Sequence, residues 1–238
     1  MILIFPPVTK PCEPPAGAAL LSAALKEQHI SCQVIDANIE GVLYLIRSDI
    51  TPVDSWSARA LKHREKIIAD IKSPELYRNM DRYHQRVYDL NKLLSLSVDE
   101  QRFRITLSDY TDSQLSSVSS RDLLSSAAHY NENPFYDYFE TCLKERIERD
   151  PSQWVGISLC YLNQALVSFA LAGWIKDRFK TKKIIMGGGL ISSWMSRPDF
   201  HEPFSALIDK MVRGEGERPL VSLMGKTPPA CHHFVPDY

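Results

Sequence analysis

Two glycine-bearing segments are the places where this sequence is best suited to hold a ligand. Gly187-Gly188-Gly189 follows a short apolar run, and Gly214-Glu215-Gly216-Glu217 follows another. Glycine adopts positive φ readily and lets the backbone approach a bulky ligand closely. The second segment leads into a predicted helix, whose free N–H groups can bind an anion or a ligand amide. Each segment also has a plain alternative, because a glycine triplet fits an ordinary turn and first-turn acids suit the helix dipole.

Polar and aromatic residues follow a third apolar run, at residues 154–159. Ser158 ends this run, and Tyr161 and Gln164 come soon after it. In an open α/β sheet the ligand crevice lies outside the carboxyl ends of the strands. We therefore expect these residues to form one rim with the glycine segments. Taken alone, Ser158 could serve only to satisfy a backbone group.

A repeated strand–helix–strand rhythm predicts the frame that carries this rim. Segments rich in apolar residues predict strands at 1–5, 31–35, 154–159, 183–186 and 206–212, and a continuous apolar run such as 1–5 is typical of a strand buried on both faces. Amphipathic patterns at 16–27 and 165–179 indicate crossover helices. Such βαβ units are right-handed and parallel. The sequence therefore predicts an α/β fold, a doubly wound, five-stranded parallel sheet of the Rossmann or flavodoxin type.

A long segment, about 43–150, separates the second and third predicted strands. Its apolar spacing predicts helices at 56–71 and 76–94 and another that begins near Asn133, with an edge strand at 103–107. Both ends of the segment return to the same sheet. We therefore expect a largely helical insertion that caps one domain spanning 1–225, with an independently folding domain as the alternative.

Composition and charge exclude several classes of partner. The 238 residues carry a formal net charge of −1, so there is no basic field to draw the chain onto nucleic acid or an anionic membrane. No apolar run reaches the roughly 18 residues that span a bilayer, and the apolar start is too short for a signal peptide. These features predict a cytoplasmic protein whose five scattered cysteines are reduced. We expect no metal site, and we expect Cys231, His232 and His233 to be solvated.

The usual cofactor fingerprints do not occur. The loop after the first strand, residues 6–17, is rich in proline and lacks G-x-G-x-x-G, which disfavours nicotinamide and flavin dinucleotides. There is no Walker A sequence and no G-x-S-x-G elbow. The rim therefore calls for another kind of ligand.

The ordered set of motifs resembles the N-terminal, cobalamin-binding domain of cobalamin-dependent radical S-adenosylmethionine (radical SAM) enzymes. The likeness covers nearly the whole chain except the insertion. Its motifs are the opening strand with Pro6-Pro7, Pro14-Pro15 and Gly17; Val34-Ile35-Asp36-Ala37-Asn38; Asn133-Pro134-Phe135; Val155-Gly156-Ile157-Ser158-Leu159 with Gln164; and the glycine triplet with Val212 to Leu220.

The resemblance implies a cobalamin site at the predicted rim. Ser158, Leu159 and the glycine triplet would flank the nucleotide tail, the segment 214–217 would close its far end, and the loop carrying Pro7 and Val8 would approach the corrin. The cofactor-binding residues expected on this basis are Pro7, Val8, Asp36, Asn38, Ser158, Leu159, Tyr161, Gln164, Gly187, Gly188, Gly189, Gly214, Glu215, Gly216 and Glu217. A leucine at Gly188 is expected to block the ligand without unfolding the sheet.

Two motifs of related proteins are missing. The first loop has no D-x-H-x-x-G, so any cobalamin is expected to bind with no histidine on cobalt. No C-x-x-x-C-x-x-C occurs, so S-adenosylmethionine and the [4Fe–4S] cluster would belong to a C-terminal radical SAM domain that follows a linker at 226–238. The resemblance thus implies a domain that is not catalytic alone, in a methyltransferase or an enzyme of related radical chemistry.

Two alternatives to a cobalamin-binding domain stay open. The same fold without a corrinoid could act as a scaffold or as a substrate-recruiting domain. A flavodoxin-like enzyme could use a mononucleotide or S-adenosylmethionine directly, although no phosphate-binding loop follows the first strand.

Overall fold

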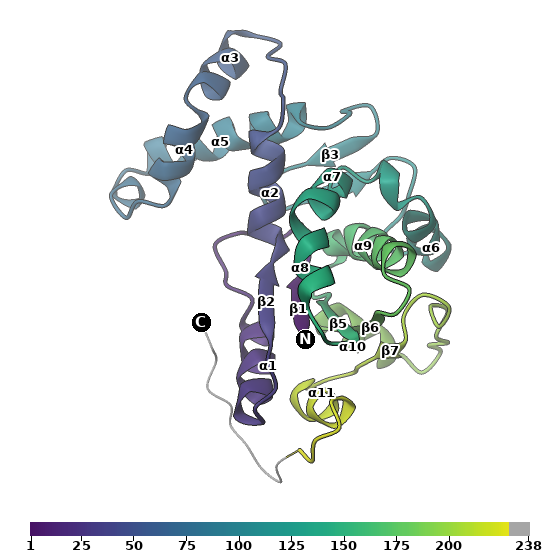
Figure 1. Ribbon diagram of the computed structural model, residues 1–238. Coiled ribbons are helices and arrows are strands. Elements are labelled where there is room, and N and C mark those ends of the chain that lie inside the picture. Colours follow the sequence, from purple (N-terminus) through teal and green to yellow (C-terminus); the bar gives the residue numbers. More distant parts are fainter. Residues whose placement is uncertain (229–238) are drawn as a thin grey trace.

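A five-stranded parallel sheet forms the centre of the protein (Figure 1). The structure is a computed structural model and describes residues 1–228. The strand order is β2-β1-β5-β6-β7, with strands β1 (Ile2–Phe5), β2 (Gln33–Asp36), β5 (Trp154–Ser158), β6 (Lys183–Gly187) and β7 (Lys210–Met211). Every neighbouring pair is parallel. The predicted doubly wound α/β fold is confirmed, and the strand order reverses between β1 and β5, where such sheets bind ligands.

The two faces of the sheet are covered by different helices, because side chains alternate along each strand. Leu3 and Ile185 pack on the face that α1 (Ala16–Glu27) and α11 (Glu217–Leu223) cover. Ile4 and Met186 belong to the larger core on the other face, with α9 (Ala165–Arg178). The face under α1 and α11 has the smaller core, and it is the face that is hollowed.

The insertion begins directly after β2 and is mostly helical, as predicted. Its helices are α2 (Ala37–Arg47), α3 (Ser55–Lys62), α4 (Arg64–Ile71), α5 (Met80–Leu96), α6 (Ser120–Ala128), α7 (Tyr136–Tyr138) and α8 (Lys144–Arg149). A π-helical turn at 139–143 joins α7 to α8. Helices α3 to α5 project away from the sheet as an arm beyond α2 (Figure 1).

Several predicted element boundaries are wrong. The helix expected at 56–71 is interrupted at His63. The helix expected at 76–94 begins as a short 3-10 turn, and α5 starts only after Asn79, whose side chain caps it by accepting a hydrogen bond from Arg82 N. The segment 103–107 is not an edge strand of the main sheet. Instead β3 (Phe103–Ile105) pairs with β4 (Tyr110–Asp112) in a separate hairpin. The final strand is also shorter than predicted, because only Lys210–Met211 pair with β6.

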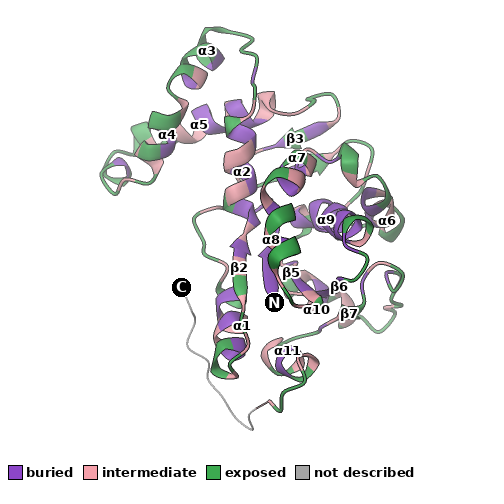
Figure 2. Cartoon of the chain, in the orientation of Figure 1, coloured by how far each residue is buried: buried purple, intermediate pink, exposed green. Residues whose placement is uncertain are grey.

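Helix α9 is buried on all sides, and the insertion supplies one of its walls. Its residues 165–175 are buried, which appears in Figure 2 as a continuous purple helix. Helix α6 lies so close that a Cβ atom on Gly173 would be 2.0 Å from the carbonyl oxygen of Ala127. The larger core therefore contains residues of both the sheet and the insertion. Within residues 1–228, no helix combines the length and apolar character needed to cross a membrane.

Candidate functional site

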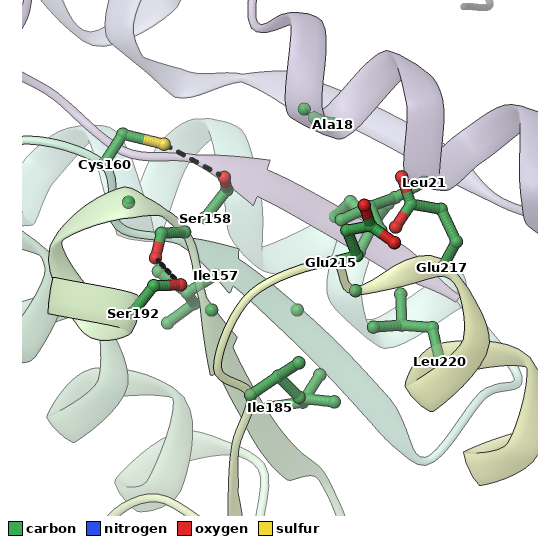
Figure 3. Close-up of a pocket in the computed structure, with 18 of the residues that line it drawn as sticks. Ala18, Leu21, Ile157, Ser158, Cys160, Ile185, Ser192, Glu215, Glu217 and Leu220 are labelled. Atoms are coloured by element: carbon green, nitrogen blue, oxygen red, sulfur yellow. Dashed lines mark hydrogen bonds between the residues drawn. The ribbon is translucent and has the colours of Figure 1, made fainter. Parts of the chain in front are cut away.

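A cavity of about 450 Å³ lies between α1, α11 and the sheet (Figure 3). Helix α1 contributes Ala18 and Leu21, and α11 contributes Leu220. Ile185 lies on the sheet side, and Figure 3 shows Glu215 and Glu217 close to Leu21 at the end of the cavity near α11. The remaining lining comes mainly from the carboxyl halves of β5 and β6 and from the loops that follow them. The cavity thus occupies the predicted rim and extends beneath two helices along one face of the sheet.

Glycines leave this cavity open at its floor and at its roof. Gly156 lies mid-strand in β5, and a Cβ atom there would be 2.5 Å from Leu3 Cδ2. Gly187 ends β6, where an added Cβ would meet only ordinary contacts with Val212. On α1, a Cβ added to Gly17 would have no atom within 4 Å, so it would point into open space. Larger residues at these positions would fill the volume that the glycines leave free.

Gly188 has a backbone role as well as a lining role. Its φ is +108°, and a Cβ atom would lie 2.4 Å from the carbonyl oxygen of Leu159. This conformation turns the chain from β6 into α10 (Gly189–Met195). The expectation that a leucine at Gly188 would spare the sheet is therefore wrong, since any side chain there meets backbone atoms. Gly17 is the position at which the cavity can be filled without such a clash.

Hydroxyl groups hold the loops at one end of the cavity. Ser192 Oγ accepts a hydrogen bond from Gly214 N at 2.9 Å and donates one to Gly188 O, also at 2.9 Å. Ser158 Oγ lies 3.5 Å from Cys160 Sγ, a contact that Figure 3 marks with a dashed line. These bonds fix the two glycine segments relative to each other.

The ionisable groups that line the cavity are acidic or neutral. Glu215 and Glu217 lie on the α11 side and Cys160 at the other end, and within the described chain no lysine or arginine lines the cavity. Helix α11 has only seven residues and carries an acid in its first turn, so the predicted anion site at its start is disfavoured. Carboxylates accept hydrogen bonds, so the lining suits a ligand with amide donors better than a free phosphate.

A second hollow of about 200 Å³ adjoins the cavity under the proline-rich loop. The two share four lining residues, Gly17, Ala18, Ser158 and Cys160. The loop contributes Lys10, Glu13 and the pair Pro14-Pro15 to the second hollow. Tyr161, which follows β5, also lines it. Together the two hollows form a trough that runs from beneath α1 and α11 to the carboxyl edge of β1 and β5.

The structure brings just over half of the predicted site residues together. The residues that line the first cavity are Ser158, Gly187, Gly188, Gly189, Gly214, Glu215, Gly216 and Glu217. Tyr161 lines the adjoining hollow and is 46% exposed. The other predicted residues, Pro7, Val8, Asp36, Asn38, Leu159 and Gln164, line neither space.

The residues outside the trough instead hold its loops in place. Asn38 is buried and exchanges two hydrogen bonds with the backbone of Thr9, at 2.9 and 3.0 Å. Asp36 caps α2 by accepting from Ile39 N, and burial raises the pKa of its carboxyl group despite this bond. Leu159 is fully buried, and its carbonyl oxygen accepts from Leu190 N.

Gln164 ties the loop after β1 to the loop after β5. Its Nε2 donates to Pro6 O at 2.6 Å, and its Oε1 accepts from the backbone N–H groups of Cys160 and Tyr161. The side chain is fully buried. Gln164 therefore uses both ends of its amide to fix the switch point, and nothing of it faces the cavity.

Gly17, Gly156, Cys160 and Ser192 line the cavity but were not among the predicted site residues. Gly156 had a usable signal, because a glycine inside a strand often marks close approach of a ligand or another backbone. Ser192 had none, since a serine inside an unpredicted short helix carries no pattern. Its role depends on the distance between two loops that only the fold brings together.

Metal-binding side chains do not gather in the described part of the chain. Within residues 1–228 there is no group of three or more His, Cys, Asp and Glu side chains that could hold a metal ion. No histidine lines either hollow in that range. Cys231, His232 and His233, and most of the expected linker at 226–238, lie outside the described residues.

Comparisons with known proteins gave no relative for this chain. No protein-family profile, no curated protein and no solved structure matched it significantly. The function must therefore be argued from the trough itself.

Proposed function

We propose that this chain is the corrinoid-binding domain of a cobalamin-dependent radical SAM enzyme and holds its cofactor with no histidine on cobalt. One observation carries the proposal, which is the glycine-lined cavity between α1, α11 and the sheet. Its volume of about 450 Å³ falls within the roughly 300–1,000 Å³ typical of small-molecule sites. The resemblance to cobalamin-binding domains implies a nucleotide tail along the sheet, at the position of this cavity.

The shape of the trough supports a ligand with a narrow tail and a broader body. The larger hollow is sheltered by two helices and floored by Gly156 and Gly187, so it suits a flat, largely apolar group. The smaller hollow opens at the strand edge beneath the loop that contains Pro14 and Pro15. A cobalamin would place its nucleotide tail in the first hollow and its corrin over the second.

The charges of the trough favour cobalamin over a mononucleotide. Glu215 and Glu217 line only the first hollow, where the nucleotide tail would lie, and their carboxylates can accept hydrogen bonds from hydroxyl or amide donors there. A mononucleotide would bring a phosphate monoester of nearly two negative charges next to these carboxylates, whereas the phosphodiester of a cobalamin tail carries only one. No lysine or arginine of the described chain lines that cavity to offset the repulsion. Within the trough, Lys10 lines the smaller hollow and not the larger one, and Glu13 lines the same smaller hollow.

When bound, a corrinoid supplies a cobalt centre that can carry a methyl group. The chain itself provides the binding and the orientation. Leu21 and Leu220 would exclude water from the tail, and Ser192 would keep the Gly188 and Gly214 segments at a fixed spacing. No histidine of the described chain lines either hollow, so the trough would hold a corrinoid without an imidazole ligand from these residues.

Retention of hydroxocobalamin tests the proposal directly. The protein is mixed with the corrinoid, desalted, and its visible spectrum recorded under aerobic and reducing conditions. We expect the corrinoid band to stay with the protein, and we expect Gly17→Leu to weaken binding by about 10-fold or more because its side chain enters the cavity. Ala23→Leu, on the same helix but outside the cavity, is the matched control.

Two results would count against the proposal. Absence of any retained band in both conditions would favour a scaffold or substrate-recruiting domain of the same fold. Equal retention by the wild type and Gly17→Leu would place the corrinoid somewhere other than the cavity between α1 and α11.

A further inference from the structure

A second large hollow, which we call the arm groove, lies within the insertion and shares only one lining residue, Lys10, with the trough of the proposed corrinoid site. It has a volume of about 410 Å³ and is lined by α2, α4 and α5, with the loop residues Lys10, Pro11 and Cys12 along one border. Figure 1 shows how it arises, because α4 and α5 extend away from α2 at a steep angle. Among the described residues, the side chains of α2, α4 and α5 and of the neighbouring loops leave this space open.

The walls of the arm groove are apolar. Val42 and Ile46 lie one turn apart on α2, and Val87 and Leu90 lie on one face of α5. Ile68 of α4 adds to the same wall. These spacings of three and four residues are those of side chains on a single helix face. An apolar groove of this size that stays open to solvent usually marks a binding site.

The charged residues of the arm groove are all basic. Lys10 and Lys72 line it, both are exposed, and neither forms an ion pair with any residue in the range 1–228. No carboxylate of residues 1–228 lines the groove. Glu65 is close enough to Lys72 to feel its charge, but Arg47 holds it with two hydrogen bonds of 2.9 and 3.0 Å. The two ammonium groups are therefore available to an anion.

We propose that the arm groove binds an amphiphile with one apolar chain and an anionic head group. The apolar chain lies between α2 and α5, where burial of its methylene groups provides most of the affinity. The head group lies near Lys10 and Lys72, where opposite charge orients the molecule. The proposal goes beyond the function proposed above, because nothing in it requires a corrinoid.

Binding of a matched pair of probes tests this assignment. Decanoate and 1-decanol have the same chain length and differ in the charge of the head group. In titration calorimetry with the whole chain, we expect decanoate to bind about 10-fold more tightly than 1-decanol. The double variant Lys10→Gln, Lys72→Gln should remove that preference while both probes still bind. Both lysines are exposed, so this variant leaves the fold intact.

A second pair of variants locates the apolar chain. Val87→Glu puts a carboxylate into the arm groove and should reduce binding of both probes by at least ~10-fold. Tyr88→Glu changes the next residue, which is 61% exposed and outside the groove, and should bind like the wild type. Circular dichroism of both variants shows whether the helices are retained.

Three results would overturn the proposal. The first is absence of decanoate binding to the wild type. The second is equal affinity of the wild type and the folded Val87→Glu variant for decanoate. The third is a dimer in light scattering that Val87→Glu abolishes, because the arm groove would then be covered by a second copy of the chain. None of these measurements involves a corrinoid, so they are independent of the function proposed above.

Discussion

Ser192 Oγ accepts a hydrogen bond from the backbone N–H of Gly214 at a distance of 2.9 Å. The same hydroxyl donates to Gly188 O, so one side chain joins the two glycine segments that border the cavity. Gly188 and Gly214 both have positive φ. The geometry of the candidate site therefore depends on one serine that bridges two turns.

Removal of this hydroxyl should loosen the cavity more than the fold. We expect Ser192→Ala to lower the free energy of unfolding by about 1–2 kcal/mol, because two hydrogen bonds are lost. The dissociation rate of hydroxocobalamin should increase, because the Gly214 segment is then free to move away. Thermal unfolding and a stopped-flow chase with excess free corrinoid measure the two effects. Ser196→Ala, an exposed position on the segment that follows α10, should leave the dissociation rate unchanged.

Two glycines of the trough should respond to substitution in opposite ways. Gly188→Ala forces a Cβ into contact with Leu159 O in a left-handed conformation, so we expect a loss of at least ~2 kcal/mol of stability. Gly17→Ala adds a Cβ in open space on a helix, where alanine is favoured over glycine by about 0.5–1 kcal/mol. Chemical denaturation of both variants checks the signs. A stable Gly188→Ala variant would contradict the backbone role of that glycine.

The part of the candidate site that could be predicted from the sequence is the glycine segments, because a glycine itself indicates that the backbone needs room for a neighbouring group. The glycine segments after β6 and before α11 fall into the cavity as expected. Val8, Asn38 and Gln164 turn inward instead, and a sequence does not show which side of a loop a residue faces. Asn38 bonds to Thr9 and Gln164 bonds to Pro6, and both partners lie in the loop after β1, so these bonds exist only once β1 lies between β2 and β5.

Replacement of Gln164 should disturb the switch point even though it lies outside the cavity. Gln164→Ala leaves the carbonyl of Pro6 and the N–H groups of Cys160 and Tyr161 without this partner. We expect destabilisation of about 2–4 kcal/mol, since buried polar groups are expensive to leave unpaired. Gln164→Glu keeps the acceptor for Cys160 N and Tyr161 N but loses the donor to Pro6 O, so its stability should lie between those of Gln164→Ala and the wild type. Equilibrium unfolding in urea distinguishes the three proteins, and equal stabilities would argue against a positioning role.

The stability of the protein should fall in acid partly through Glu140. Burial alone would raise its pKa, but hydrogen bonds from Trp174 Nε1 and Arg178 Nε, at 2.9 and 2.7 Å, lower the pKa below its ordinary value of 4.5. A lowered pKa in the folded state favours the ionised form. The stabilisation is thus present above about pH 4.5 and is lost as the pH falls through the pKa of the folded protein.

Glu140→Gln should therefore be less stable than the wild type at pH 7, by about 1–2 kcal/mol. The difference should shrink as the pH is lowered below 4.5, because the wild-type carboxylate is then neutralised too. Melting temperatures at a series of pH values measure this convergence. Glu145→Gln removes only an exposed pair with Arg149 and serves as the control, with an expected change below about 0.5 kcal/mol. A constant difference at all pH values would contradict the assignment.

The fold was more predictable than its boundaries. Strands β1, β5 and β6 are short, mainly apolar segments, and such segments are typical of strands that are buried on both faces of a parallel sheet. The interruptions at His63 and Asn79 were missed, because the apolar spacing continues across them. Asn79 ends one helical turn and caps the next through its side chain, a local competition that periodicity alone does not register.

The contact between Gly173 and Ala127 determines what can be removed from this protein. A helix backbone of the insertion lies against the central crossover helix with no room for a methyl group between them. Excision of residues 43–150 would expose the face of α9 that carries this glycine, together with the buried side chains beside it. Removal of the insertion should therefore destabilise the sheet domain. A shortened variant would need polar substitutions on the face of α9 that the insertion now covers.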